Sequence, residues 1–192
     1  MKGVLPCLGG LLFAGAAFAQ DLPVGDLDAG RKVAGQCRTC HGLNGFARIP
    51  IAPHIGGEPA EYLAAQLQAF RDGTRAHEMM TVVASGLSDA AIADVSAWYA
   101  QHQVTATLFA DEADAPEGCV SCHGAHGIAL IEGVPNLAGE TNIYIATQLK
   151  DFRGGKRTHE VMSSISADLS DDDIRALADW FAAIELDIES ND

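Results

Sequence analysis

Two short segments of the chain carry the same reactive side chains at the same spacing. The first reads CRTCHG and the second reads CVSCHG. Two thiols separated by two residues, with a histidine directly after the second, are the arrangement that attaches a c-type haem: the thiols bond to its vinyl groups and the histidine lies beneath the iron. We therefore predict two covalent haem c groups as cofactors. The predicted attachment residues and first iron ligands are Cys37, Cys40, His41, Cys119, Cys122 and His123.

A zinc knuckle is an alternative use of a Cys-x-x-Cys pair. Structural zinc takes four nitrogen or sulfur ligands, usually in clustered pairs. A zinc site would leave unexplained why methionine recurs at one distance from each motif, so we favour haem.

The second axial ligand of an electron-carrying haem is commonly methionine, because a soft thioether favours ferrous iron and raises the reduction potential. The interval along the chain from His41 to Met80 is identical to the interval from His123 to Met162. We predict Met80 and Met162 as the second ligands and Met79 as a packing residue.

The remaining histidines divide into two kinds. His77 and His159 recur in both halves of the chain, and bis-histidine ligation through them is the alternative to methionine. His54, His102 and His126 have no histidine at the matching position, and we predict that they lie on the surface.

The chain repeats itself at one constant offset, the one that pairs Cys37 with Cys119, and the match needs no gap from Cys37 to Ala182. A repeat of this length indicates tandem copies of one small domain. A small domain has a limited core, and a covalently held macrocycle would supply much of its apolar centre. We predict a first cytochrome c domain at residues 20–100, a linker at 101–115 and a second domain at 116–192.

Both copies show helical patterns, and no segment shows the alternation typical of a strand. A helix over 27–41, with Asp28 as its N-cap, leads to the first motif. Its counterpart carries Pro116 and Gly118 and should be shorter. Pro59 and Gly73 bound a helix in the first copy, and Ser170 with Asp173 forms a capping box before the last helix of the second. The predicted fold class is therefore all-α, with two tandem helical domains, each wrapped on a covalent haem.

The segment 1–19 reads as a secretory signal peptide, with Lys2, an apolar run and the small-x-small sequence Ala17-Phe18-Ala19. The apolar run is short for the alternative, a membrane anchor. Cleavage would leave 11 Lys and Arg against 26 Asp and Glu, a net charge of −15. We predict a periplasmic protein without a membrane span after cleavage, which repels nucleic acid and favours redox partners with basic docking surfaces.

These residues together resemble the dihaem cytochrome c4 family, in which two class I cytochrome c domains lie in tandem. The stretches that carry the resemblance are CRTCHGLNG, PHIGGEPAEYLAAQLQAFRDGTR and MMTVVASGLSDAAIADVSAWYA, with their second-copy equivalents. The resemblance implies that the carbonyl groups of Pro53 and Pro135 accept hydrogen bonds from the ligating histidines. It also implies that the two haems face each other across the domain boundary.

Haem propionates at that boundary would need cationic or hydroxyl partners. The candidates are Arg71, Arg75, Arg153, Arg157, Tyr62 and Tyr144. Helix-end cations and core tyrosines are the alternative interpretation of these residues.

Two irons with both axial positions filled have no vacant site for oxygen or peroxide. We therefore predict an electron carrier of a respiratory chain rather than an enzyme, between a quinol-oxidising bc complex or dehydrogenase and a terminal oxidase or reductase. One alternative is the cytochrome subunit of a flavocytochrome c-type sulfide dehydrogenase. A dihaem peroxidase is a further alternative, but it needs an openable haem, against which the two equivalent methionines argue.

Overall fold

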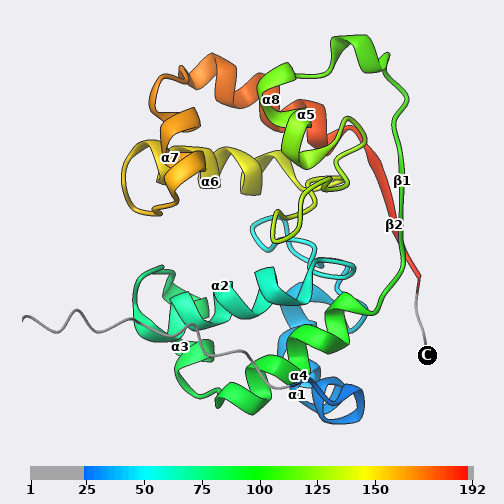
Figure 1. Ribbon diagram of the computed structural model, residues 1–192, viewed down its shortest axis with the longest axis vertical. Helices are drawn as coiled ribbons and strands as arrows, with labels where there is room; N and C mark the ends of the chain where they lie inside the picture. Colours follow the sequence, from blue (N-terminus) through cyan, green and yellow to red (C-terminus); the bar gives the residue numbers. More distant parts are fainter. Residues whose placement is uncertain (1–23, 190–192) are drawn as a thin grey trace, which may run out of the picture.

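The computed structural model describes residues 24–189, so the predicted signal peptide at residues 1–19 lies outside the described residues. The described chain is mainly helical, and one arrangement of four helices occurs twice (Figure 1). The helices of the first domain are α1 (Leu27–His41), α2 (Ala60–Asp72), α3 (Glu78–Ser85) and α4 (Asp89–Ala100). The helices of the second domain are α5 (Glu117–His123), α6 (Asn142–Arg153), α7 (Glu160–Ala167) and α8 (Asp171–Ala182).

Local signals in the sequence set most of the helix ends. Gly73 ends α2 in the left-handed conformation with φ of 78°, and Ser170 with Asp173 forms the predicted capping box of α8. The predicted N-cap of α1 is wrong. The cap is Asp26, whose side chain accepts a hydrogen bond of 2.8 Å from the N–H of Ala29, and Asp28 lies in the first turn.

The two motif helices differ in length, as predicted. α5 begins directly after Pro116 and has 7 residues, whereas α1 has 15. α1 packs closely across α4 at Gly30, where an added Cβ atom would lie only 2.1 Å from the carbonyl oxygen of Asp94. The helix that carries the first motif is therefore held in place by its packing against α4.

Each domain has a separate small hydrophobic core. The buried core residues of the first domain are Ala34, Leu63, Val95, Trp98 and Tyr99. Those of the second domain are Ala138, Ile145, Leu149, Ile174, Ala178, Phe181 and Ile184. Small cores of this kind agree with domains that fold around a further apolar group.

The expectation that no strands are present is wrong for two short segments. β1 (Val104–Thr107) pairs antiparallel with β2 (Glu185–Ile188), with Ala106 opposite Leu186. β1 lies within the segment 101–115 that was predicted as a linker, and a 3₁₀ helix, Glu112–Asp114, follows it. Both strands are too short for alternation to be distinctive, and each is stabilised by a partner far away in the sequence.

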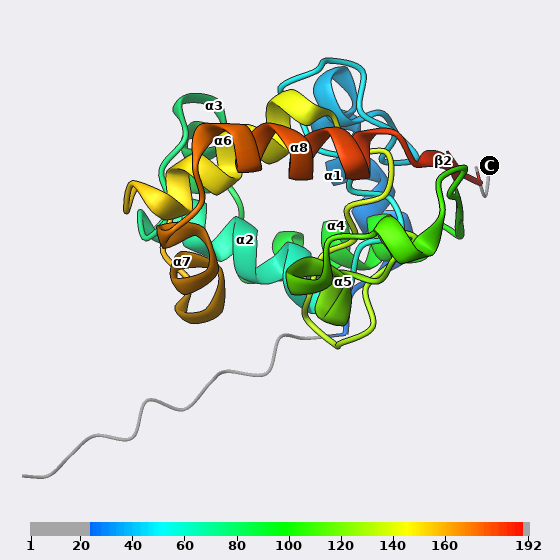
Figure 2. The same ribbon diagram turned by 90° about the horizontal axis from the view of Figure 1, so that it is seen from above.

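The domains lie one over the other, with their loops between them and the β1–β2 ribbon along one edge (Figures 1 and 2). The ribbon contacts both domains. The side chain of Asn44 donates to the carbonyl of Ile188 at 3.3 Å, and an added Cβ at Gly139 would lie 2.6 Å from Leu186. Among residues 24–189, no helix has the length and apolar character that crossing a membrane requires.

Candidate haem sites

Each Cys-x-x-Cys-His motif forms the last turn of a helix, and the chain reverses at the glycine that follows. His41 ends α1 and His123 ends α5. Gly42 has φ of 72°, and a Cβ atom there would lie 2.4 Å from the carbonyl oxygen of Phe46. Gly124 has φ of 74° and an equally close approach to the oxygen of Ile128, at 2.2 Å. The glycine therefore permits the close return of the chain behind each motif.

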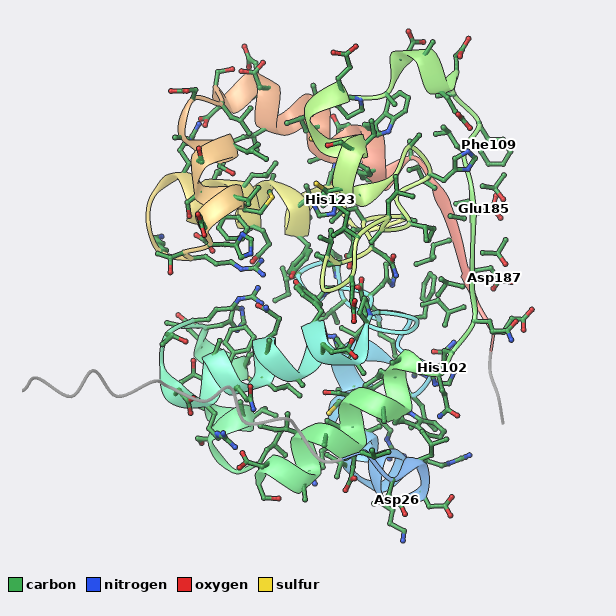
Figure 3. All side chains as sticks on the ribbon, viewed as in Figure 1. Asp26, His102, Phe109, His123, Glu185 and Asp187 are labelled. Carbon is green, nitrogen blue, oxygen red and sulfur yellow. The ribbon has the colours of Figure 1, made fainter. Side chains whose placement is uncertain are left out.

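The two motif histidines have the same hydrogen-bond partner in each domain. Nδ1 of His41 donates to the carbonyl of Pro53 at 2.9 Å, and Nδ1 of His123 donates to the carbonyl of Pro135 at 2.9 Å. Because a carbonyl oxygen only accepts, the proton is on Nδ1 and the lone pair is on Nε2. Burial lowers the pKa of both imidazoles, which favours the neutral form that binds metals. Figure 3 shows His123 at the inner side of α5, near the loops between the domains.

Within the described residues the four motif cysteines form no disulfide bond, and all four are partly buried. The two thiols of each motif lie on one face of their helix, because residues three apart are neighbours on a helix surface. Burial raises the pKa of the Cys37 and Cys119 thiols. This arrangement of two adjacent thiols and one oriented imidazole is the donor set that a covalent haem requires.

The two candidate methionine ligands occupy equivalent positions. Met80 is the third residue of α3 and Met162 is the third residue of α7, and both are half-buried. Met162 packs against the core of the second domain. Met79 is 63% exposed, so the prediction that it is a packing residue is wrong.

The rival histidine ligands cap the helices that carry the methionines. Nδ1 of His77 accepts from the N–H of Met80 at 3.4 Å, and Nδ1 of His159 accepts from the N–H of Met162 at 3.3 Å. Both imidazoles are exposed. Their position at the helix N-termini favours methionine over bis-histidine ligation.

Two histidines that were predicted at the surface are buried. His54 is 8% exposed and His102 is 4% exposed, whereas His126 is exposed as predicted. Nδ1 of His102 donates to the carbonyl of Glu189 at 3.1 Å, and its ring packs edge-on against Trp98. A comparison of the two repeats could not predict this burial, since His54 donates to Gly139 and His102 donates to Glu189, both far along the chain.

Of the candidate propionate partners, the structure brings four together at the domain boundary. Arg75 donates to Gln148 of the second domain at 2.7 Å, and Arg157 donates to Gln66 of the first domain at 3.0 Å. The hydroxyl groups of both tyrosines accept from these arginines, Tyr144 from Arg75 and Tyr62 from Arg157.

The hydrogen-bond partners of these two guanidinium groups within the described residues are neutral oxygens. Two half-buried cations with neutral partners fit the carboxylates of two haems. The structure does not bring Arg71 and Arg153 to this place. They bind Asp89 and Asp171, at 2.7 and 2.6 Å, and so connect helices within their own domains.

The zinc alternative would need four nitrogen or sulfur ligands close together. Within residues 24–189, no group of three or more histidine, cysteine, aspartate and glutamate side chains is arranged to hold a metal ion.

Sequence reasoning missed one pair of buried carboxylates between the two sites. Glu58 is 5% exposed and Glu140 is 3% exposed. The repeat contained a signal for them, because the offset that pairs the two haem motifs also pairs these two glutamates. Buried carboxylates are uncommon and need hydrogen-bonded surroundings. A glutamate at the same position of both repeats could therefore have been examined as a candidate buried residue.

Comparison with known proteins assigns this chain to a family. A curated cytochrome c4 of Pseudomonas aeruginosa is 32% identical over 180 residues, which cover 83% of this chain and 89% of the relative. This chain belongs to the cytochrome c4 family. The crystal structure of reduced recombinant cytochrome c4 from Pseudomonas stutzeri superposes with a TM-score of 0.73 at 30% identity, and the match covers 84% of this chain and all of that one.

Two further matches agree with membership of the cytochrome c4 family. A thiosulfate dehydrogenase electron acceptor of Stutzerimonas stutzeri is 30% identical over 169 residues, covering 77% of this chain and 78% of the relative. The family model described as cytochrome c oxidase, cbb3-type, subunit III matches residues 112–181. The prediction of an all-α cytochrome c fold is confirmed. With its two Cys-x-x-Cys-His motifs, this member of the family is a dihaem c-type cytochrome and an electron carrier.

Proposed function

We propose that this protein is an exported electron carrier in which each haem iron is closed by one histidine and one methionine. The residues that would hold the haems are Cys37, Cys40, Cys119 and Cys122 through thioether bonds and His41, Met80, His123 and Met162 at the irons. The observation that carries the proposal is the equivalence of the two sites. In each domain a histidine with Nδ1 bonded to a proline carbonyl precedes, by the same interval, a half-buried methionine at the start of a helix.

Two kinds of group at each site would act on the iron, a backbone carbonyl and a methionine sulfur. The carbonyl groups of Pro53 and Pro135 fix the histidine rings and increase the basicity of the ligating nitrogens. The methionine sulfurs of Met80 and Met162 would close the remaining position of each iron and would favour its ferrous state. When bound, a haem supplies a centre that takes up and releases one electron. With both axial positions filled, the protein would move electrons and not transform a substrate.

The boundary residues would place the two haems near each other. Arg75 and Arg157 each reach into the opposite domain, and each has a tyrosine hydroxyl beside it. Charge-assisted hydrogen bonds from these guanidinium groups to haem propionates would neutralise both cations and orient both haem edges toward the boundary. Such an arrangement would let one electron pass between the domains.

Its location and charge would determine its partners. A signal peptide at residues 1–19 would send the protein to the periplasm. The mature chain would carry a net charge of −15, which accelerates association with basic docking surfaces. The electron donor would be a quinol-oxidising complex or a dehydrogenase, and the acceptor a terminal oxidase or reductase.

A second candidate function is that of a bound electron acceptor of a sulfur-compound dehydrogenase. The similarity to a thiosulfate dehydrogenase electron acceptor favours it. The cytochrome subunit of a flavocytochrome c-type sulfide dehydrogenase belongs to the same class. Purification at native expression level distinguishes the two functions: a free carrier elutes at the mass of one chain, whereas a subunit elutes together with a dehydrogenase.

The near-infrared band of ferric haem, which arises from sulfur-to-iron charge transfer, tests the ligation. Met80→Ala and Met162→Ala should each remove about half of the band, since each site supplies one of two sulfur ligands. Met79→Ala is the matched control, because Met79 is adjacent and exposed, and it should keep the whole band. Retention of the full band in either of the first two variants would contradict that ligand assignment.

A further inference from the structure

The buried carboxylates Glu58 and Glu140 lie between the two haem sites. Each directly follows a glycine with positive φ, Gly57 at 74° and Gly139 at 65°. Oε2 of Glu58 accepts a hydrogen bond of 3.0 Å from the backbone N–H of Asn136, which belongs to the second domain. The contact therefore crosses the boundary.

The second carboxylate, Glu140, faces the equivalent backbone group of the first domain, and its Oε2 accepts no hydrogen bond among residues 24–189. The backbone N–H groups of His54, in the first domain, and of Thr141 face Glu140 and act to lower its pKa. His54 and Asn136 are equivalent in the repeat, since the offset that pairs Cys37 with Cys119 also pairs these two residues. The two contacts are thus related by the internal symmetry of the molecule.

Each contact ends on the peptide group that orients a haem-ligating histidine. The N–H of Asn136 and the carbonyl of Pro135 belong to one peptide group, and that carbonyl accepts from His123 at 2.9 Å. In the first domain, the peptide group between Pro53 and His54 likewise joins His41 to the Glu140 carboxylate. A carboxylate on the N–H side polarises the peptide group, and a polarised carbonyl is a stronger acceptor for the imidazole N–H.

The surroundings make the charge of these carboxylates sensitive to conditions. Burial raises the pKa of Glu58 to about 8. Burial also raises the pKa of Glu140, and the nearby charge of Glu58 raises it further. The titratable groups that face Glu140 from other elements are Tyr144, whose pKa burial raises to about 12, and His54, whose pKa burial lowers. The charges of Arg75 and Arg157 act to lower the pKa of Tyr144.

We propose that Glu58 and Glu140 are positioning residues that act across the domain boundary, each setting the strength of the histidine–proline hydrogen bond of the haem site in the other domain. This inference rests on the proposed function, since it needs His41 and His123 as iron ligands. Glu58 therefore controls the iron held by His123, and Glu140 controls the iron held by His41.

The direction of the effect follows from charge. An ionised carboxylate strengthens the acceptor, makes the imidazole more basic and stabilises ferric iron, so it lowers the reduction potential. A protonated carboxylate does the reverse. The potential of each haem accordingly falls as pH rises through the pKa of the glutamate in the opposite domain, and oxidation releases part of a proton.

The test replaces each carboxylate by its neutral isostere, Glu58→Gln and Glu140→Gln. The matched controls are Glu61→Gln and Glu132→Gln, which remove the same charge from exposed positions of the same domains. Both potentials are measured in spectroelectrochemical titrations between about pH 5 and about pH 9, a range that contains the raised pKa of Glu58, about 8. The hyperfine-shifted haem methyl resonances of the ferric proteins assign each haem to its domain and report the orientation of its imidazole.

Glu58→Gln should raise the potential of the His123 haem and remove its pH dependence. The change in the one-electron equilibrium constant should be on the order of tenfold, about 59 mV. Glu140→Gln should do the same for the His41 haem, and neither control should change either potential by more than a small fraction of this. The methyl resonances of the opposite domain should move with the potential.

Three results would overturn the inference: an effect on the haem of the same domain, an equal effect in the controls, or pH-independent potentials in the unsubstituted protein. If the near-infrared band is intact in all variants, such a result defeats the inference and leaves the proposed ligation standing. If a glutamine variant does not take up haem, the pH titration of the haem methyl resonances in the unsubstituted protein decides. The inference then requires one titration step near pH 8 in the resonances of the His123 haem.

Discussion

Nε2 of His54 in the first domain donates to the carbonyl of Gly139 in the second domain at 3.1 Å. Its equivalent, Asn136, returns the same bond, from Nδ2 to the carbonyl of Gly57 at 3.0 Å. Each side chain also accepts a hydrogen bond from a backbone N–H of its own domain. Nδ1 of His54 accepts from Ala47, and Oδ1 of Asn136 accepts from Ala129. A histidine and an asparagine thus perform one task on the two sides of the boundary, and only the histidine can be protonated near neutral pH.

We predict that His54→Asn makes the protein less sensitive to acid. Burial lowers the pKa of His54 in the folded protein below its value in the unfolded chain. Stability from the neutral ring is therefore complete above about pH 6.5 and is lost as pH falls through that value toward the folded pKa. Thermal unfolding should show a smaller loss between about pH 7.5 and about pH 5 in the variant.

His126→Asn is the control for this experiment, since His126 is exposed and pairs with Glu112. It should retain the acid sensitivity of the unsubstituted protein. At about pH 7.5 the free energy of unfolding of His54→Asn should lie within about 1 kcal/mol of the original, because asparagine can form both bonds. An acid sensitivity equal in both variants would contradict the assignment.

Two glycines of α1 should respond in opposite ways to alanine. A Cβ at Gly30 would lie 2.1 Å from the carbonyl oxygen of Asp94, whereas a Cβ at Gly35 has no neighbour within 4 Å. Gly30→Ala should force α1 away from α4 and lower the free energy of unfolding by about 3 kcal/mol. Gly35→Ala should raise it by about 0.5–1 kcal/mol, because it removes the helix cost of glycine. Denaturant unfolding of the haem-loaded proteins measures both, and destabilisation of equal size would exclude close packing at Gly30 as the cause.

An arginine that bonds across the domain boundary and an arginine paired within one domain should differ in their effect on that boundary. Arg75→Gln removes the bond to Gln148 in the second domain, whereas Arg71→Gln removes an ion pair with Asp89 inside the first domain. We expect faster amide hydrogen exchange in the loops between the domains for Arg75→Gln and unchanged exchange for Arg71→Gln. If both variants loosen these loops equally, Arg75 does not hold the domains together.

Removal of one pair of thiols should leave a protein with one haem. Cys119→Ser with Cys122→Ser should halve the pyridine haemochromogen absorbance, and the same change at Cys37 and Cys40 should have the same effect. The two variants should differ in stability. The second domain begins with the shorter motif helix, α5 of 7 residues, and should lose more helical circular dichroism without its haem than the first domain does. A full haem content in either variant would contradict the attachment sites.

Much of this protein could be predicted from short-range patterns. The Cys-x-x-Cys-His motifs, the capping box of Ser170 and the short helix after Pro116 depend on neighbours within a few residues, and the structure contains the helices they predict. The repeat extended this reading, because its constant offset pairs Met162 with Met80 and not with Met79, without any knowledge of the fold. Domain number, fold class and candidate haem residues were all available at this level.

Predictions failed where a residue's partner lies far away in the sequence. β1 is a strand because β2 pairs with it, and His54 is buried at a place where the carbonyl of Gly139 accepts a hydrogen bond from its ring. The repeat showed that Glu58 and Glu140 are equivalent, but only the docking of the domains placed each carboxylate against the peptide group beside the opposite histidine. The sequence by itself determined what each domain is, because local spacing specifies helices and a haem motif. The tertiary structure alone decided how the two domains act on each other, because burial and hydrogen bonding across a boundary depend on contacts that no local pattern contains.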